Sequence, residues 1–143
     1  MLLVDTPPGT SDEHLSIVQY LAGARLRGAV VVTTPQEIAL QDVRKEITFC
    51  RKVEVPVLGL VENMAMFVCP SCHLSSSLLP ASTGGAVALG EEVGVQVLAR
   101  LPLDPLVGRA CDQGESLFVD HGGTEVAAAY RRLTEALGKC LQS

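Results

Sequence analysis

The chain has 143 residues, of which 48% are hydrophobic and 19% charged, and its formal net charge is -5. This composition excludes a disordered chain, and the acidic balance with 3% aromatic residues argues against a nucleic-acid-binding surface, which needs clustered cations and stacking rings. No apolar run reaches membrane-spanning length, and the first residues lack the basic-then-apolar pattern of a secretory signal. We therefore expect a cytoplasmic protein that engages neither nucleic acid nor membrane.

Four apolar runs without polar alternation predict buried parallel strands, at residues 2–4, 29–33, 55–61 and 95–101. The first run begins at the second residue and ends at Asp5. A domain rarely starts inside a core strand, so we expect the chain to be incomplete at its N-terminus.

Helix-start patterns stand between the predicted strands. Thr10 with Glu13 forms a candidate capping box, and Thr34, Pro35 and Glu37 repeat the device. Further helices are predicted at residues 84–93 and 106–113, and after the Gly122-Gly123 break. This alternation predicts an α/β fold with a doubly wound, mostly parallel sheet, and a single domain over residues 1–143.

Asp5 closes the first predicted strand and is followed by two prolines and Gly9. Ligands of open α/β sheets bind outside the carboxyl ends of the strands, where an acid can hold Mg²⁺ through water. Gly9 permits backbone torsions that a Cβ would forbid. The residues alone leave two interpretations open, a nucleotide-responsive switch or a plain strand-to-helix turn.

The stretch 63–82 is the one long irregular segment, and it holds Cys69-Pro70-Ser71-Cys72. Two cysteines at this spacing can place both thiolates on one metal or cluster. A single CxxC is ambiguous among zinc, iron–sulfur and redox roles, and one chain supplies only half of a tetrathiolate site.

Six segments of the chain form an ordered set of motifs. They are Leu3-Val4-Asp5-Thr6-Pro7-Pro8-Gly9-Thr10-Ser11-Asp12-Glu13-His14, Thr33-Thr34-Pro35-Gln36-Glu37, Asp42-Val43-Arg44-Lys45-Glu46, Val61-Glu62-Asn63-Met64, Cys69-Pro70-Ser71-Cys72 and Leu101-Pro102-Leu103-Asp104-Pro105. In this order they resemble the Mrp/Nbp family of deviant P-loop ATPases, which is related to MinD and to the nitrogenase iron protein, with the cytosolic iron–sulfur cluster assembly factors as the most similar members. The resemblance fades after about residue 120.

The resemblance implies roles for individual residues of an ATP and magnesium site. Asp5 corresponds to the Walker B acid and Gly9 to the switch glycine that senses the γ-phosphate. Asn63 corresponds to the asparagine that reads the adenine, and the loop of Pro102, Leu103 and Asp104 to the segment beside the base. Without the resemblance, Asn63 is better interpreted as a strand-end cap.

The resemblance also implies that Cys69 and Cys72 of two subunits bridge one [4Fe–4S] cluster across a two-fold axis. Partners would then be a second copy or a related nucleotide-binding protein, and recipient iron–sulfur apoproteins. A zinc ion shared in the same way is the alternative for the cysteines. The alternatives for the chain are a truncated, non-enzymatic interaction module and a MinD-like ATPase.

The family's glycine-rich phosphate loop, with its Lys and its Ser or Thr, does not precede Asp5, and Gly138-Lys139-Cys140 lacks the pattern. That loop cradles the phosphates, so we expect these residues alone to be inactive as an ATPase. We also expect low stability, because a strand that borders the loop in relatives would be missing from the sheet.

Overall fold

The computed structural model describes residues 2–69, 71–72 and 74–142. Within them, the main sheet has three parallel strands, β1 (Ala29–Thr33), β2 (Val57–Glu62) and β5 (Val97–Arg100), in the order β1-β2-β5. Ala29 lies opposite Val57, and Leu60 opposite Val97. The predicted α/β class with a parallel sheet is confirmed.

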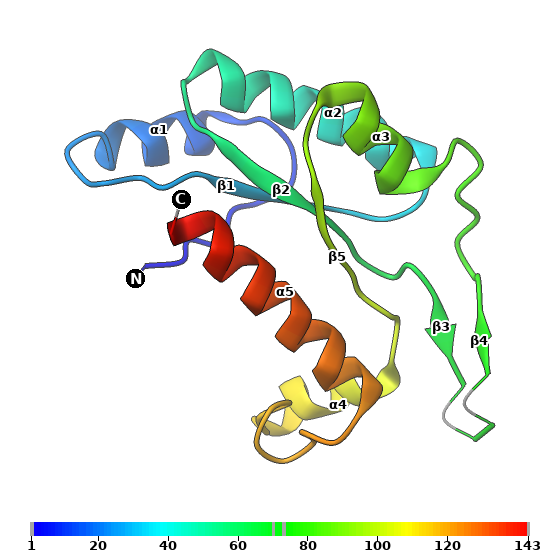
Figure 1. Ribbon diagram of the computed structural model, residues 1–143. Coiled ribbons are helices and arrows are strands. Elements are labelled where there is room, and N and C mark those ends of the chain that lie inside the picture. Colours follow the sequence, from blue (N-terminus) through cyan, green and yellow to red (C-terminus); the bar gives the residue numbers. More distant parts are fainter. Residues whose placement is uncertain (1, 70, 73, 143) are drawn as a thin grey trace.

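Helices cover both faces of this sheet (Figure 1). On one face, α2 (Glu37–Lys52) and α3 (Gly85–Val93) enclose a core of Val31, Leu40, Val43, Ile47, Leu60 and Leu89. On the other face, α5 (Glu125–Gln142) covers a second cluster of Val61, Leu101 and Ala129 with Val30, Leu98, Ala99, Tyr130 and Leu133. In the described part of the chain, no helix has both the length and the hydrophobicity to cross a membrane.

Two further helices flank this core. The helix α1 (Asp12–Tyr20) touches α2 where the His14 ring meets Phe49 edge-on, with ring centroids 6.0 Å apart. The helix α4 (Pro105–Gln113) begins just beyond the end of β5. Both helices therefore lie next to segments that the sequence singles out, residues 5–12 and 101–105.

The predicted irregular segment contains a small hairpin that projects from the end of β2 (Figure 1). Its strands are β3 (Phe67–Val68) and β4 (Ser75–Ser76), paired antiparallel. Pro70 and His73 lie outside the described residues. The hairpin gives Cys69 and Cys72 a defined support that the sequence did not predict.

The predicted strand at residues 2–4 is wrong. This segment is extended coil, and Leu2 and Leu3 are 76% and 81% exposed. A strand needs a neighbour for its backbone N–H and C=O groups, and among the described residues β1 pairs only with β2. An apolar run is therefore insufficient to form a strand where no partner strand lies beside it.

Two predicted helix starts are displaced along the chain. The N-cap of α1 is Ser11, whose N–H donates to His14 Nδ1 at 3.3 Å, and Thr10 lies one residue before it. The N-cap of α2 is Gln36, with Thr34 and Pro35 ahead of the helix. Local capping patterns thus located both helices but missed their first residues.

Candidate functional site

The carboxyl ends of β2 and β5 run side by side beyond the sheet itself. Ala65 donates its N–H to the Leu101 carbonyl at 3.0 Å, and Leu103 donates to the Met66 carbonyl at 2.7 Å. Phe67 and Leu103 form an isolated parallel bridge. The structure therefore brings the predicted base-binding segments, Asn63 and the 102–104 loop, onto adjacent extensions of two strands.

Asn63 is half-buried at the first position after β2. Its N–H donates to the Thr33 carbonyl at 2.7 Å, and its Oδ1 accepts the Met64 N–H at 2.9 Å. In the described residues, the side-chain NH₂ group of Asn63 has no hydrogen-bond partner. The amide therefore keeps two donors that can bind ring nitrogens of a base.

Asp104 has a structural task that explains its position. It is the N-cap of α4, and its Oδ1 accepts the Leu106 N–H at 2.8 Å. An aspartate in this role satisfies one of the free amide groups of the first turn. Pro102 and Leu103 precede it as half-buried residues, so the loop backbone and these two side chains can line a ligand.

Cys69 and Cys72 lie at the tip of the hairpin. Cys69 is half-buried directly after β3, and its N–H donates to the Leu74 carbonyl at 3.1 Å across the turn. Cys72 is exposed. The tip is consequently accessible to another molecule.

The turn at the hairpin tip affects the acidity of the Cys69 thiol. Hydrogen bonds from the Cys72 N–H, then from the Ser71 N–H and from the Cys72 thiol, lower the pKa of Cys69 from its ordinary value. These bonds favour the thiolate, which is the form that binds metal. By contrast, burial raises the pKa of the Cys50 thiol in the core.

The donor set fits half of a shared site. Among residues 2–69, 71–72 and 74–142, no group of three or more Cys, His, Asp or Glu side chains is arranged to hold a metal ion. Two thiols from one chain leave a tetrahedral centre two ligands short. The residues therefore fit a centre that a second molecule completes.

Asp5 and Gly9 lie apart from these groups. Both are exposed in the coil before α1, and within the described residues no hydrogen bond joins either to the ends of β2 or β5. Gly9 has a φ of +87°, a left-handed conformation that L side chains rarely adopt, and a Cβ there would meet nothing within 4 Å. The torsion, and not crowding, is what favours glycine at this position.

Glu62 stands in the matching segment Val61-Glu62-Asn63-Met64 without a predicted role, yet it is 1% exposed at the end of β2. Its Oε2 accepts the Ala86 N–H at 2.7 Å, and its Oε1 accepts Arg100 Nε at 2.7 Å. The one available sequence signal is a charged residue that ends an apolar strand. A buried carboxylate with both oxygens bonded joins β2, β5 and the start of α3.

Thr34, just after β1, carries a second polar group at the same edge of the sheet. Its Oγ1 is buried and has no hydrogen-bond partner in the described structure. Buried polar atoms are usually satisfied, so an unpartnered hydroxyl next to the Asn63 backbone contact suggests a place for a bound molecule.

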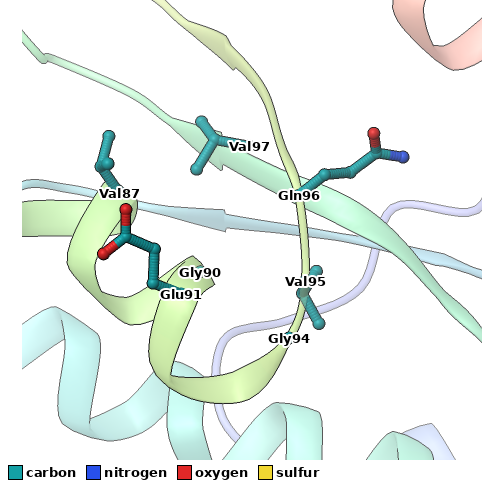
Figure 2. Close-up of a pocket in the computed structure, with 7 residues that line it drawn as sticks. All are labelled: Val87, Gly90, Glu91, Gly94, Val95, Gln96 and Val97. Atoms are coloured by element: carbon teal, nitrogen blue, oxygen red, sulfur yellow. The ribbon is translucent and has the colours of Figure 1, made fainter.

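A shallow apolar hollow of about 410 Å³ lies elsewhere, between the end of α3 and the start of β5. Figure 2 shows Val87 and Glu91 of α3 on one side of it and Val97 on the other. Because β5 begins there, the hollow is at the opposite edge of the sheet from Asn63. It takes no part in the candidate site.

Comparison with known proteins adds a family match. A family model described as ParA, NUBPL iron-transfer P-loop NTPase, matches residues 1–138. This match extends over nearly the whole chain, including both cysteines and all the strand ends described above.

Two solved structures are similar to the chain. A nucleotide-binding protein from Archaeoglobus fulgidus, in complex with ADP and with cobalt found in it, is 34% identical with a TM-score of 0.60, over 76% of this chain and 42% of that one. The cell division ATPase MinD from Pyrococcus furiosus is 23% identical with a TM-score of 0.65, over 94% and 50%. The second likeness concerns the fold alone, and the chain spans half or less of the length of either protein.

Proposed function

Because the chain belongs to the NUBPL iron-transfer P-loop NTPase family of ParA-type proteins, we propose that it acts as a cytoplasmic iron–sulfur cluster scaffold or carrier. Cys69 and Cys72 bind the cargo, a [4Fe–4S] cluster, together with the same two cysteines of a partner subunit. The observation that carries this proposal is the placement of both cysteines at the tip of one hairpin, with Cys72 exposed and the Cys69 N–H bonded across the turn to the Leu74 carbonyl.

The hairpin suits transient binding. N–H···S bonds stabilise the thiolate charge before iron arrives, so less reorganisation is needed on loading. The exposure of Cys72 lets a recipient apoprotein approach and exchange its own thiolates for those of the carrier. A deeply buried pair would hold the cluster but would release it slowly.

Symmetry accounts for the missing ligands. Two hairpins related by a two-fold axis supply four thiolates, and each contributes the same pair of residues. The partner is either a second copy or a related nucleotide-binding protein. Nucleotide binding is proposed as the regulator in a molecule that also carries the phosphate-binding loop, with Asn63 near the base and with Asp5 and Gly9 near magnesium and the γ-phosphate.

The test is anaerobic reconstitution of the chain with iron and sulfide. The wild type is expected to give a [4Fe–4S] absorption band and about four irons per dimer, as a shared cluster requires. A variant with Cys69→Ser and Cys72→Ser is the zero reference, and Cys111→Ser is the matched control because Cys111 is also exposed. Equal cluster content in the wild type and the double variant would refute the proposal.

Zinc is the competing cargo, since a tetrathiolate site also suits that metal. Metal analysis of the purified protein and an iron-against-zinc competition distinguish the two. Zinc retained against excess ferrous iron and sulfide would reassign the hairpin to a structural role.

A further inference from the structure

The cysteine hairpin is part of the segment 63–84, which leaves the sheet after Glu62 and leads into α3. We propose that Glu62 is the positioning residue of the cysteine site: its carboxylate closes the base of the segment 63–84 and thereby fixes the hairpin relative to the ends of β2 and β5. This inference rests on the proposed function, because it concerns the same two cysteines.

The Glu62 side chain connects the two ends of the segment 63–84. Glu62 is the residue immediately before the segment, and its Oε2 accepts the N–H of Ala86, just after the segment, at 2.7 Å. Its Oε1 accepts Arg100 Nε from the neighbouring strand at 2.7 Å. The segment 63–84 is thus a loop closed by a charge-assisted hydrogen bond at its base.

The chain around the carboxylate is adapted to it. Gly85 has a φ of +66°, and a Cβ at this position would stand 2.4 Å from Glu62 Oε2. The carboxylate therefore occupies the space that any other residue would need for its side chain. Gly84 precedes it as the N-cap of α3, also left-handed with a φ of +92°, so the return turn is shaped to admit the acid.

The two arms of the segment, the entry arm before β3 and the exit arm after β4, bond to different parts of the fold. The entry arm, from residue 63 to β3, runs along the 101–103 extension of β5, with the hydrogen bonds of Ala65 and Leu103 described above. The exit arm after β4 makes its first hydrogen bonds to the sheet and helices, within the described residues, at Thr83 with Glu37 and at Ala86 with Glu62. Within the described residues β4 pairs with β3 alone, so the exit contacts hold the second side of the hairpin, while the bonds of Ala65 and Leu103 hold the first.

Burial makes this a demanding arrangement for an acid. A carboxylate removed from water is costly unless it is paired and hydrogen-bonded, and apolar packing would stabilise a sheet at least as well. Glu62 is 1% exposed, whereas Arg100 keeps its side chain 48% exposed. Glu62 provides a directed hydrogen bond to the first turn of α3, across the base of the segment 63–84, which an apolar residue could not provide.

The experiment measures hydrogen exchange by mass spectrometry on the full chain. Glu62→Gln should make the amides of residues 64–76 exchange about tenfold faster than in the wild type, because the charged half of the closure is lost. Ile47→Val is the matched control, a core change in α2 that lowers global stability by a similar amount without touching the loop. Arg100→Gln, at a half-exposed position, serves as the second variant if Glu62→Gln does not fold.

Equal acceleration of residues 64–76 in Glu62→Gln and Ile47→Val, or none in either, would overturn the proposal, since Glu62 would then act on global stability alone. A cobalt(II) titration of the thiolate charge-transfer band supplies the second readout. Glu62→Gln should weaken cobalt binding about tenfold, or about 1.4 kcal/mol, while Ile47→Val leaves it unchanged. Unchanged cobalt affinity in Glu62→Gln also overturns the positioning role.

The two proposals fail in different ways. If the wild type and the Cys69→Ser, Cys72→Ser variant bind cobalt equally, the cysteines are not the metal site and the proposed function is wrong. Hydrogen exchange still reports on the closure in that case, because it needs no metal.

Discussion

Replacing Gly85 by alanine tests the buried carboxylate from the opposite side of its contact. The new Cβ would stand 2.4 Å from Glu62 Oε2, and the residue would have to keep a φ of +66°. The torsion costs about 1 kcal/mol for an L residue. Displacing the carboxylate from the Ala86 N–H costs roughly 2 kcal/mol more, as for other hydrogen bonds to charged groups.

Gly94→Ala provides a matched control at the other end of the same helix. Gly94 has a φ of +69°, and a Cβ there would meet nothing within 4 Å. This variant should therefore lose only the torsional term of about 1 kcal/mol. With about 3 °C of Tm per kcal/mol for a chain of this size, we expect Tm to fall by roughly 9 °C for Gly85→Ala and by roughly 3 °C for Gly94→Ala.

The assay is thermal unfolding followed by circular dichroism, with urea unfolding as the check on free energy. A double-mutant cycle identifies the cause of the difference: in a Glu62→Ala background, Gly85→Ala should cost no more than Gly94→Ala does, since the carboxylate is gone. Equal Tm losses for Gly85→Ala and Gly94→Ala in the wild-type background would refute the reasoning, because the clash would then contribute nothing.

Three further predictions concern single positions. Iodoacetamide should modify Cys69 with a rate midpoint at lower pH than for a free cysteine peptide, because the lowered pKa of Cys69 supplies more thiolate. Peptide mapping after timed quenching at several pH values measures the rate, and a midpoint equal to that of the free peptide would contradict the prediction. Asp104→Ala should lower the free energy of unfolding by about 1 kcal/mol in urea unfolding, while Asp104→Asn should keep most of that stability because asparagine also caps a helix. An equally large loss in the asparagine variant would contradict the capping role. Val31→Ala should lower the free energy of unfolding by about 1–2 kcal/mol and Val32→Ala by under about 0.5 kcal/mol, because Val31 is 9% exposed and Val32 59%. The reverse order in urea unfolding would be inconsistent with the burial of Val31.

Parts of the fold that depend on side-chain pattern over a whole element could be predicted from the sequence. The strand at β1 was predicted with its observed bounds, because Ala29 to Thr33 are uniformly apolar up to the final threonine. The strand at β2 was displaced by two residues at its start. Its predicted first residue, Val55, is buried but precedes Pro56, which cannot donate to a sheet.

The N-terminal segment shows where local pattern reasoning fails. Residues 2–4 have the composition of a buried strand but no strand beside them, and Leu3 is 81% exposed. Pairing is a non-local property, so composition could not determine it. The prediction for Asp5 depended on that strand, and its role remains a proposal for the same reason.

The residues of the candidate site also differ in whether the sequence could reveal them. Cys69 and Cys72 could be found from spacing alone, because the ligand geometry of a CxxC lies within four residues. Glu62 could not, since its partners Ala86 and Arg100 are far away in the chain and meet it only through the sheet. A lone acid next to apolar residues carries no sequence signal of what it binds.

The position of Asn63 determines how a nucleotide could influence the cysteines. Asn63 and the cysteine hairpin both follow β2, and they are separated by a segment that is hydrogen-bonded to the 101–103 extension of β5. A base bound at Asn63 would contact this segment and not the hairpin tip, so its effect must travel through the entry arm. Coupling then requires the exit arm to be fixed, because a loop free at one end absorbs a displacement without moving as a unit. On this reasoning Glu62→Gln should weaken any coupling between nucleotide and cluster.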